Sequence, residues 1–223
     1  EMFLHGVLKD RFGVLISEKG SFHKHREVGT LPDESNILQP RGYVDLIGAD
    51  IILVDAAGEI QVLSKSNQND WYPEVITSNL NNFFLTNTGR NKYIDRPVRD
   101  ILVTDDYLYI VYIDNTTPPN NEGIVDTFTA VVRAKLDREY LTFNKVFHLP
   151  MAKYPDNSWH AGGKIQQYGK NEFLITVPDS GDTKAVQNLK SPVGKILKFS
   201  PMDDIEKYEI FSIGHRNPQG FLW

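Results

Sequence analysis

Short apolar runs separated by turn residues recur along most of the chain. Residues 44–47 and 51–54 flank Gly48-Ala49-Asp50, and a third run follows at 59–63. Alternating or continuous apolar runs of this length, bounded by Gly, Asn and Asp, are typical of β-strands joined in hairpins. The first part of the chain is therefore predicted to form an antiparallel meander.

The same pattern predicts four more hairpins further along the chain. They pair residues 100–103 with 108–113, 128–136 with 143–149, 163–167 with 173–177, and 194–199 with 208–213. Helical periodicity is hard to find over ten or more residues, and only 79–84 and 182–189 suit a short helical turn. The chain is thus expected to be all-β.

The hairpins repeat, which narrows the choice of architecture. Equivalent turns fall near Asp50, Asp105 and Lys170, so the spacing is about 55–65 residues. Short antiparallel strands at such a period, with long polar loops at 64–72, 87–93, 114–123 and 154–159, favour four-stranded propeller blades. We predict a partial β-propeller of three to four blades over residues 41–223, preceded by a segment, 1–40, that matches no recognisable pattern. Because the pattern stops within a motif at Trp223, a larger ring is expected.

Composition excludes several function classes. Charged residues make up 24% of the chain and the net charge is −5, which argues against a nucleic-acid surface. No apolar run approaches the roughly 18 residues of a membrane span, so no span is expected. The chain has no cysteine, hence no disulfide or thiolate metal site. Its first residues lack the basic start and apolar run of a signal peptide.

Two segments at the ends of one predicted hairpin carry residues suited to proton transfer. His160 precedes the first strand, and Asp179 follows the second strand, nineteen residues later. A hairpin returns the chain to the edge it left, so these two residues are expected to lie close together. A carboxylate that accepts the imidazole N–H fixes the tautomer and makes His160 a better base. The alternatives are a histidine hydrogen-bonded within its own loop and an aspartate in a turn.

A third segment, residues 214–220 (Gly-His-Arg-Asn-Pro-Gln-Gly), is too rich in Gly, Pro and amides for a strand or helix. If the strand before it lies in the next blade, this loop emerges on the same face as His160. Arg216 is then placed to stabilise negative charge on a substrate or cofactor. The alternative is an arginine paired with a carboxylate of a neighbouring blade.

These segments, in this order, resemble the soluble quinoprotein glucose dehydrogenases and the related aldose sugar dehydrogenases, the glucose/sorbosone dehydrogenase family. Residues 158–165 (Ser-Trp-His-Ala-Gly-Gly-Lys-Ile) and 173–182 are similar to two of its segments. The strongest match is residues 193–198 (Val-Gly-Lys-Ile-Leu-Lys) followed by 214–220. Weaker similarity runs back through 129–150 and 100–115 to about Gly42.

The resemblance implies a six-bladed propeller that binds pyrroloquinoline quinone (PQQ) and calcium and oxidises the C1 hydroxyl of an aldose to a lactone. His160 would be the general base, Asp179 would orient it, Arg216 would face the quinone carbonyl, and Asn217 would help hold the cofactor. The calcium ligands and the remaining cofactor contacts would lie beyond Trp223. A periplasmic or extracellular location is also implied, while the sugar and the electron acceptor stay open.

The chain departs from the family at one place near the expected sugar site. The family has a Gln-x-Gly-Leu-Leu-like segment where this chain has residues 95–99 (Asp-Arg-Pro-Val-Arg). This departure supports an alternative hypothesis: a propeller that kept the scaffold, lost the chemistry and binds proteins or sugars. In a lectin-like form, Trp71, Trp159 and Tyr168 would stack on sugar faces.

Overall fold

The computed structural model describes residues 15–16, 22–23, 42–65, 71–86, 97–116, 128–149, 162–179 and 181–220. Apart from two single-turn 3-10 helices, η2 (Leu80–Asn82) and η3 (Ala185–Gln187), every regular element in these ranges is a strand. The strands are β1 (Leu15–Ile16), β2 (Phe22–His23), β3 (Gly42–Ile47), β4 (Asp50–Asp55), β5 (Ile60–Lys65), β6 (Trp71–Ser78), β7 (Val98–Val103), β8 (Tyr107–Asp114), β9 (Phe128–Lys135), β10 (Tyr140–Leu141), β11 (Asn144–Leu149), β12 (Ile165–Gly169), β13 (Glu172–Val177), β14 (Lys195–Phe199) and β15 (Glu209–Ile213).

The chain divides into two compact units, Glu1–Ile76 and Thr77–Trp223. The first unit contains the short antiparallel pair β1–β2 and the antiparallel meander β3-β4-β5-β6. Gly48 makes the tight turn between β3 and β4 with a φ of +63°, a left-handed conformation that glycine adopts without strain. One face of this meander buries Ile51, Leu53 and Leu63.

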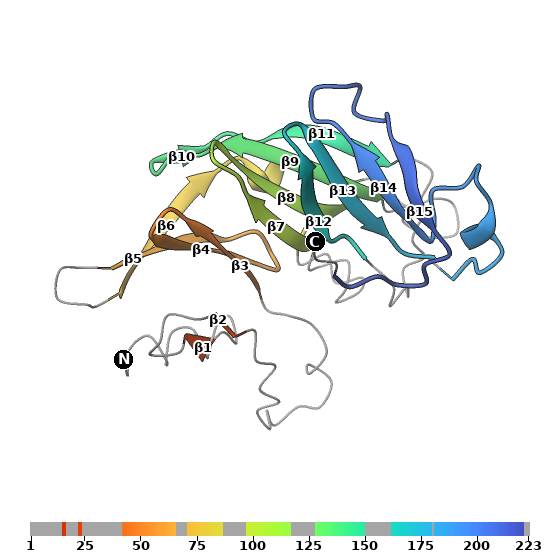
Figure 1. Ribbon diagram of the computed structural model, residues 1–223. Helices are drawn as coiled ribbons and strands as arrows, with labels where there is room; N and C mark the ends of the chain where they lie inside the picture. The colour runs from red at the N-terminus through yellow and green to blue at the C-terminus, as the bar shows by residue number, and fades with distance from the viewer. Residues whose placement is uncertain are drawn as a thin grey trace. The chain divides into compact units, whose positions relative to one another are not determined.

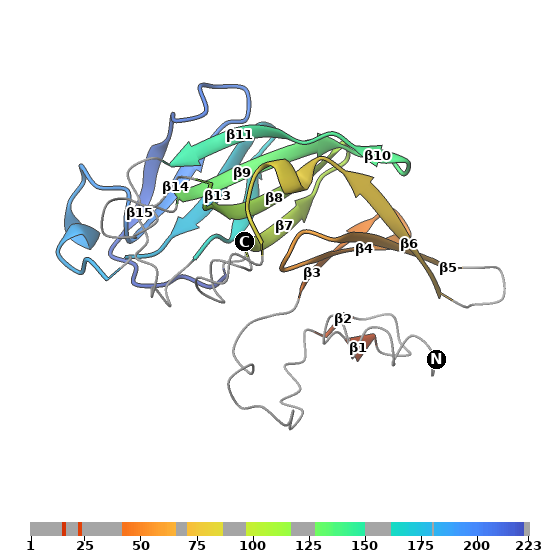
Figure 2. The same cartoon turned by 180° about the vertical axis from the view of Figure 1, so that it is seen from behind.

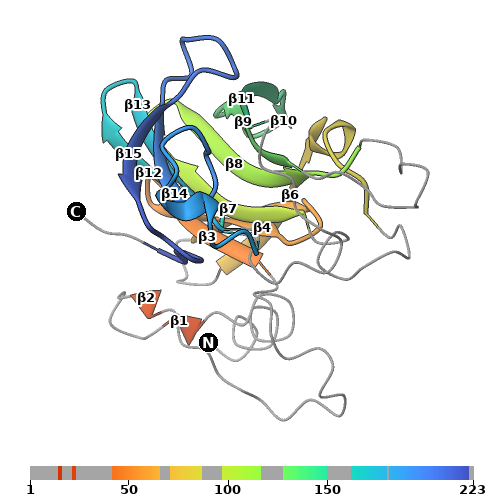
Figure 3. The ribbon, with the colours of Figure 1, turned by 90° about the vertical axis from the view of Figure 1, so that its right-hand side faces the viewer.

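The second unit contains two four-stranded antiparallel sheets. Their strand orders are β11-β9-β8-β7 and β12-β13-β14-β15, so each sheet combines two of the predicted hairpins. The two sheets pack face to face. Figures 1 and 2 show them from opposite sides of the molecule, and Figure 3 shows them after a quarter turn from the view of Figure 1. Strand β10 pairs in parallel with the last two residues of β6, Thr77 and Ser78.

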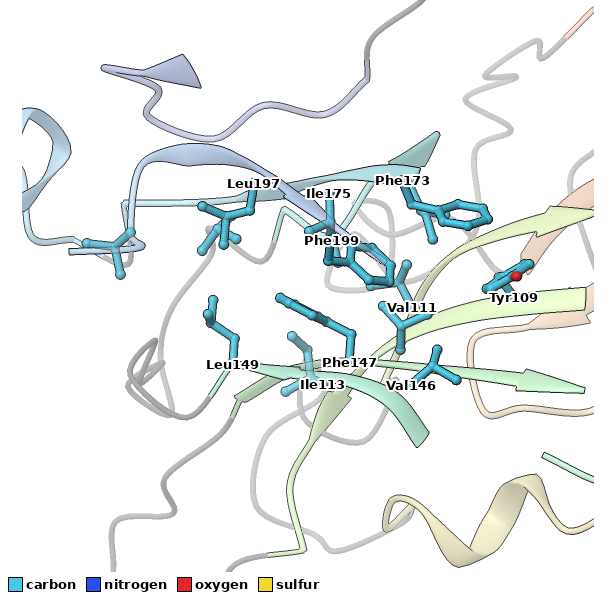
Figure 4. Packing of buried hydrophobic residues seen from close by; sticks show 14 residues of the cluster. Tyr109, Val111, Ile113, Val146, Phe147, Leu149, Phe173, Ile175, Leu197 and Phe199 are labelled. Atoms are coloured by element: carbon cyan, nitrogen blue, oxygen red, sulfur yellow. The ribbon is translucent and has the colours of Figure 1, made fainter. Parts of the chain in front are cut away.

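The core of the second unit lies between the two sheets (Figure 4). It is built by aliphatic side chains from the alternating positions that face inward and by a run of aromatic contacts. Tyr109 meets Phe173 at 4.6 Å between ring centroids, and Phe147 meets Phe199 at the same separation. Each of these pairs joins one sheet to the other, and buried aromatic pairs of this kind stabilise beyond their area alone. The two sheets therefore pack against each other within one compact unit.

Most of the predicted elements are confirmed. All the predicted hairpins form, the two suggested helical turns appear as η2 and η3, and the four-stranded meanders are three blades, within the predicted three to four. One expectation is wrong: residues 64–72 are not wholly a loop, because β5 continues to Lys65 and β6 begins at Trp71. Strand β6 was not predicted from the sequence. It contains Pro73 and its residues from Tyr72 to Val75 are exposed, so it lacks the apolar alternation of a half-buried strand.

Candidate functional site

Three segments of the last blade converge at one end of its sheet. They are the start of β12 at residues 162–165, the end of β13 at 176–179, and the loop after β15 at 214–220. The strand before this loop lies in the same blade as β12 and β13, rather than in the next blade as the sequence argument supposed. The loop reaches the other two segments because it turns back from the outer strand past the end of β13.

Asp179 lies just beyond the end of β13 and is 2% exposed. Its main-chain amide donates a 2.7 Å hydrogen bond to the carbonyl of Arg216. Its carboxylate Oδ1 accepts a hydrogen bond from the amide of Gly181 at 3.1 Å, and its own carbonyl accepts one from the amide of Asp182 at 2.8 Å. Three hydrogen bonds, with Arg216, Gly181 and Asp182, therefore hold Asp179 in place.

Arg216 and Asn217 follow each other in the loop and face different partners. Arg216 is exposed, so its guanidinium can meet a ligand, while its carbonyl holds Asp179. The side-chain Oδ1 of Asn217 accepts hydrogen bonds from the amide of Gly162 at 3.2 Å and from Nε2 of Gln219 at 2.7 Å. Asn217 thus joins the loop to the chain two residues after His160.

Thr176 completes the junction from within β13. Its hydroxyl accepts a hydrogen bond from the amide of Lys164 at 2.9 Å and donates one to the carbonyl of Pro218 at 3.1 Å. Thr176 is fully buried and its two partners are partly buried, so both bonds lie largely out of water. One side chain therefore ties the start of β12 to the loop.

The glycines at the start of β12 permit close contact with two other segments. A Cβ on Gly162 would lie 2.7 Å from Cδ of Pro178, and a Cβ on Gly163 would lie 2.7 Å from Cβ of Arg99 on β7. Both glycines have positive φ, +44° and +79°. Neither position tolerates a larger residue without displacing its neighbour.

The neighbouring blade is tied to the start of β12 by charge. Asp100 on β7 accepts a hydrogen bond from the amide of Ile165 at 3.1 Å, and its other oxygen lies 3.3 Å from Nζ of Lys164. The same ammonium donates to the carbonyl of Arg99 at 3.1 Å. Arg99, from the stretch that departs from the family pattern, is itself buried beside Gly163.

Several residues singled out in the sequence lie outside the described ranges. They are His160, Trp159, Asp95 and Arg96. Of the other two aromatics considered for sugar stacking, Trp71 is half-buried on β6 with Nζ of Lys65 5.9 Å from its ring, and Tyr168 is 46% exposed and packs edge-on against Phe211. Among the described residues, no group of three or more potential ligands could hold a metal ion, and no helix is long and apolar enough to cross a membrane.

Sequence reasoning missed three residues that shape this site: Asp100, Thr176 and Lys195. Thr176 was detectable, because it is the one polar residue in the apolar run at 173–177 and a buried hydroxyl requires partners. Lys195 begins β14 and is fully buried, which its place at the start of a strand did not suggest. Asp100 resembled an ordinary residue at the start of a hairpin.

A family model described as Glucose / Sorbosone dehydrogenase matches residues 94–223. No curated protein matches the chain in a sequence search. Among solved structures, the apo form of the soluble aldose sugar dehydrogenase from Escherichia coli matches with a TM-score of 0.55 and 16% identity, covering 79% of this chain and 51% of that one. The PQQ-bound form of aldose sugar dehydrogenase from Streptomyces coelicolor matches with a TM-score of 0.53 and 18% identity, covering 79% and 51%.

A third structure, described as glucose dehydrogenase, has a TM-score of 0.54 and 15% identity and covers 79% of this chain and 56% of its own. The chain therefore spans about half of the length of the structures that it matches. At these identities the likeness shows the fold, which is that of a partial β-propeller.

Proposed function

Since the chain belongs to the glucose/sorbosone dehydrogenase family, we propose that it is a quinone-dependent sugar dehydrogenase that oxidises the C1 hydroxyl of an aldose to a lactone. The substrate is a small sugar. The cofactor is PQQ, as in the related structure from Streptomyces coelicolor.

The donor groups in the loop after β15 suit such a cofactor. PQQ is a planar molecule with carboxylates and two adjacent carbonyls, so it requires cations and amide donors around its edge. Arg216 offers an exposed guanidinium, and Asn217 has an amide Nδ2 beside its occupied oxygen. When bound, PQQ supplies the acceptor for the two electrons and the proton that leave C1 as hydride.

The residues of this chain would then divide the remaining work. His160 takes the proton of the C1 hydroxyl, and Asp179 holds its imidazole in the reactive tautomer and strengthens it as a base. Arg216 stabilises the negative charge that reaches the quinone carbonyl with the hydride, and Asn217 positions the edge of the cofactor.

One observation carries this proposal. The 2.7 Å hydrogen bond from the amide of Asp179 to the carbonyl of Arg216 couples the buried carboxylate to the exposed cation. A carboxylate that orients a base and a cation that receives charge must keep a fixed separation for proton and hydride to leave the same carbon. A direct backbone bond between the two residues serves that requirement.

Three further features belong to the same proposal. Residues 41–223 form the partial propeller domain, and residues 1–40 lie outside it. Calcium binds together with the quinone. The location is periplasmic or extracellular, as the resemblance implied.

The test is a titration of the calcium-loaded, full-length protein with PQQ, followed by a panel of aldoses, with cofactor absorbance as the readout. We expect stoichiometric binding and sugar-dependent reduction that is lost in His160→Ala. His25→Ala is the matched control, because no role is assigned to that histidine, and it should behave as the wild type.

If the folded full-length protein fails to bind PQQ, the dehydrogenase is ruled out. The alternative then gains support: a propeller that binds a protein or a sugar without chemistry. If PQQ binds and is reduced equally well by His160→Ala, the quinone assignment stands and the base is another residue.

A further inference from the structure

Lys195 is a fully buried lysine whose ammonium bonds to main-chain carbonyls. It is the first residue of β14, and alternation places its side chain on the same face of the sheet as the core residues Leu197 and Phe199. Its relative exposure is 0%. A buried ammonium is costly unless every proton finds an acceptor.

Three main-chain carbonyls provide those acceptors. Nζ of Lys195 donates to the carbonyl of Ala185 at 3.0 Å, to that of Val186 at 2.8 Å, and to that of Val193 at 2.8 Å. An ammonium has three protons, so this set satisfies it completely. No ion pair between described residues includes Lys195, so its described partners are all carbonyls of the 185–193 loop. Burial lowers the pKa of Lys195 below its usual value.

The 185–193 loop is in turn bonded to the site. The carbonyl of Val186, which Lys195 holds, also accepts a hydrogen bond from the amide of Gly214 at 3.1 Å. Gly194 accepts one from the amide of His215 at 3.0 Å and donates its own amide to the carbonyl of Pro178 at 2.9 Å. Hydrogen bonds and directly bonded neighbours therefore connect Lys195 to Pro178 and His215, the residues that immediately precede Asp179 and Arg216.

We propose that Lys195 is a positioning residue for this site: its buried ammonium locks the 185–193 loop, and that loop sets where the 214–220 loop leaves β15. The position of Arg216 relative to Asp179 is then determined by a cation that touches neither residue. The positioning role of Lys195 does not depend on the proposed function. Its consequence does: if the proposed function is right, the locked loop presents Arg216 and Asn217 to the quinone.

The test compares two identical substitutions on one strand. Lys195→Met removes the ammonium and keeps the length of the side chain. Lys198→Met is the matched control, because Lys198 lies on the other face of β14 and makes partly exposed ion pairs with Glu172 and Glu209. The readout is amide hydrogen exchange of the full chain, followed segment by segment without any cofactor.

We expect Lys195→Met to accelerate exchange in residues 212–217 by about tenfold or more, since hydrogen bonds to charged groups contribute more than neutral ones. Exchange in β8 and β9 should stay as in the wild type, and Lys198→Met should leave both regions unchanged. PQQ should then bind to Lys195→Met at least about tenfold more weakly, because a mobile loop must be ordered on binding.

Two results would overturn the proposal: unchanged exchange in residues 212–217, or an equal acceleration over both sheets, which would indicate a general loss of stability. If Lys195→Met does not fold, Lys195→Gln, whose amide keeps two donor hydrogens, should show the same local effect at a smaller size. If the wild type binds no PQQ, the proposed function fails, whereas the exchange result still decides the role of Lys195.

Discussion

The hydroxyl of Thr176 donates a hydrogen bond to the carbonyl of Pro218, forty-two residues further along the chain. It also accepts a hydrogen bond from the amide of Lys164. This single side chain therefore connects the start of β12, the end of β13 and the loop that carries Arg216. Thr176 itself is fully buried, and Lys164 and Pro218 are partly buried, so removing the hydroxyl leaves both partner groups without this bond in a largely enclosed place.

Thr176→Val should consequently destabilise the protein although it preserves shape. It removes the hydrogen bonds with the amide of Lys164 and the carbonyl of Pro218. Each such bond contributes about 0.5–1.5 kcal/mol, so we expect the free energy of unfolding to fall by about 1–3 kcal/mol. Denaturant unfolding measures the change. Thr176→Ser keeps the hydroxyl and should retain most of the stability; a loss that appears in Thr176→Ser but not in Thr176→Val would mean that the methyl group, not the hydrogen bonds, matters here.

Gly163→Ala should be more damaging than Gly181→Ala. Both glycines have positive φ, +79° and +84°, so each alanine suffers a left-handed backbone cost of about 1–2 kcal/mol. A Cβ at 163 would also lie 2.7 Å from Cβ of Arg99, whereas one at 181 meets nothing within 4 Å. Overpacking adds about 1–3 kcal/mol at the first site alone. Thermal unfolding of the two variants checks the difference, and similar midpoints would contradict the contact with Arg99.

Acidification should lower the free energy of unfolding through His148, a half-buried residue of β11. Burial, and then the Lys145 ammonium, lower the pKa of His148, although Asp114 and Glu206 oppose the shift. In the unfolded chain the imidazole titrates near pH 6.5, at about the ordinary value, so the unfolded state binds the proton more tightly. The contribution of His148 to stability is therefore complete above about pH 6.5 and is lost as the pH falls toward the lower, folded pKa.

His148→Gln should flatten the decline in unfolding free energy between pH 7.5 and 5.5, as denaturant titrations at several pH values would show. The loss from one such group cannot exceed about 1.4 kcal/mol per pH unit. Asp114 is not the source of a decline in this window. Burial would raise the pKa of Asp114, but hydrogen bonds from Lys145 and Thr116 hold it below its usual value, so its contribution is lost only at more acidic pH. A decline that persists in His148→Gln would point to a different group.

The strands and turns of this fold were predictable because most of them are buried on at least one face. The run at 108–113 is continuously apolar, and the structure buries it between neighbouring strands of its sheet. Strand β6 was not predictable from the same signal, since it is largely exposed and its pairing with β5 is a backbone interaction. Periodicity detects burial rather than hydrogen bonding, which explains the difference.

The candidate site was predictable only in part, for a related reason. The residues of the 214–220 motif were evident, but its proximity to Asp179 depends on the loop turning back within one blade. The role of Lys195 depends on three carbonyls, which any residue can supply and which leave no trace in the sequence. His160 stays a prediction, because it lies outside the described residues.

The last prediction concerns the charge of Asp179. Asp179→Asn keeps an oxygen to accept the amide of Gly181 and keeps the backbone bond to Arg216, so the loops should hold their places and PQQ should still bind. The neutral amide cannot hold the imidazole of His160 in the reactive tautomer or strengthen it as a base, and we expect the rate of sugar-dependent reduction to fall by about 10²–10⁴-fold.

Asp182→Asn is the control for this change, because Asp182 is exposed and its carboxylate accepts hydrogen bonds from the amides of Lys184 and Ala185 within a turn. Its reduction rate should match the wild type. Stopped-flow absorbance of the loaded protein separates cofactor binding from reduction. A large loss of PQQ binding in Asp179→Asn with an unchanged rate per bound cofactor would show that Asp179 shapes the loop rather than orienting the base. The pH profile gives a second criterion: without the carboxylate, the pKa governing the rate should move down, since an imidazolium loses its stabilising partner.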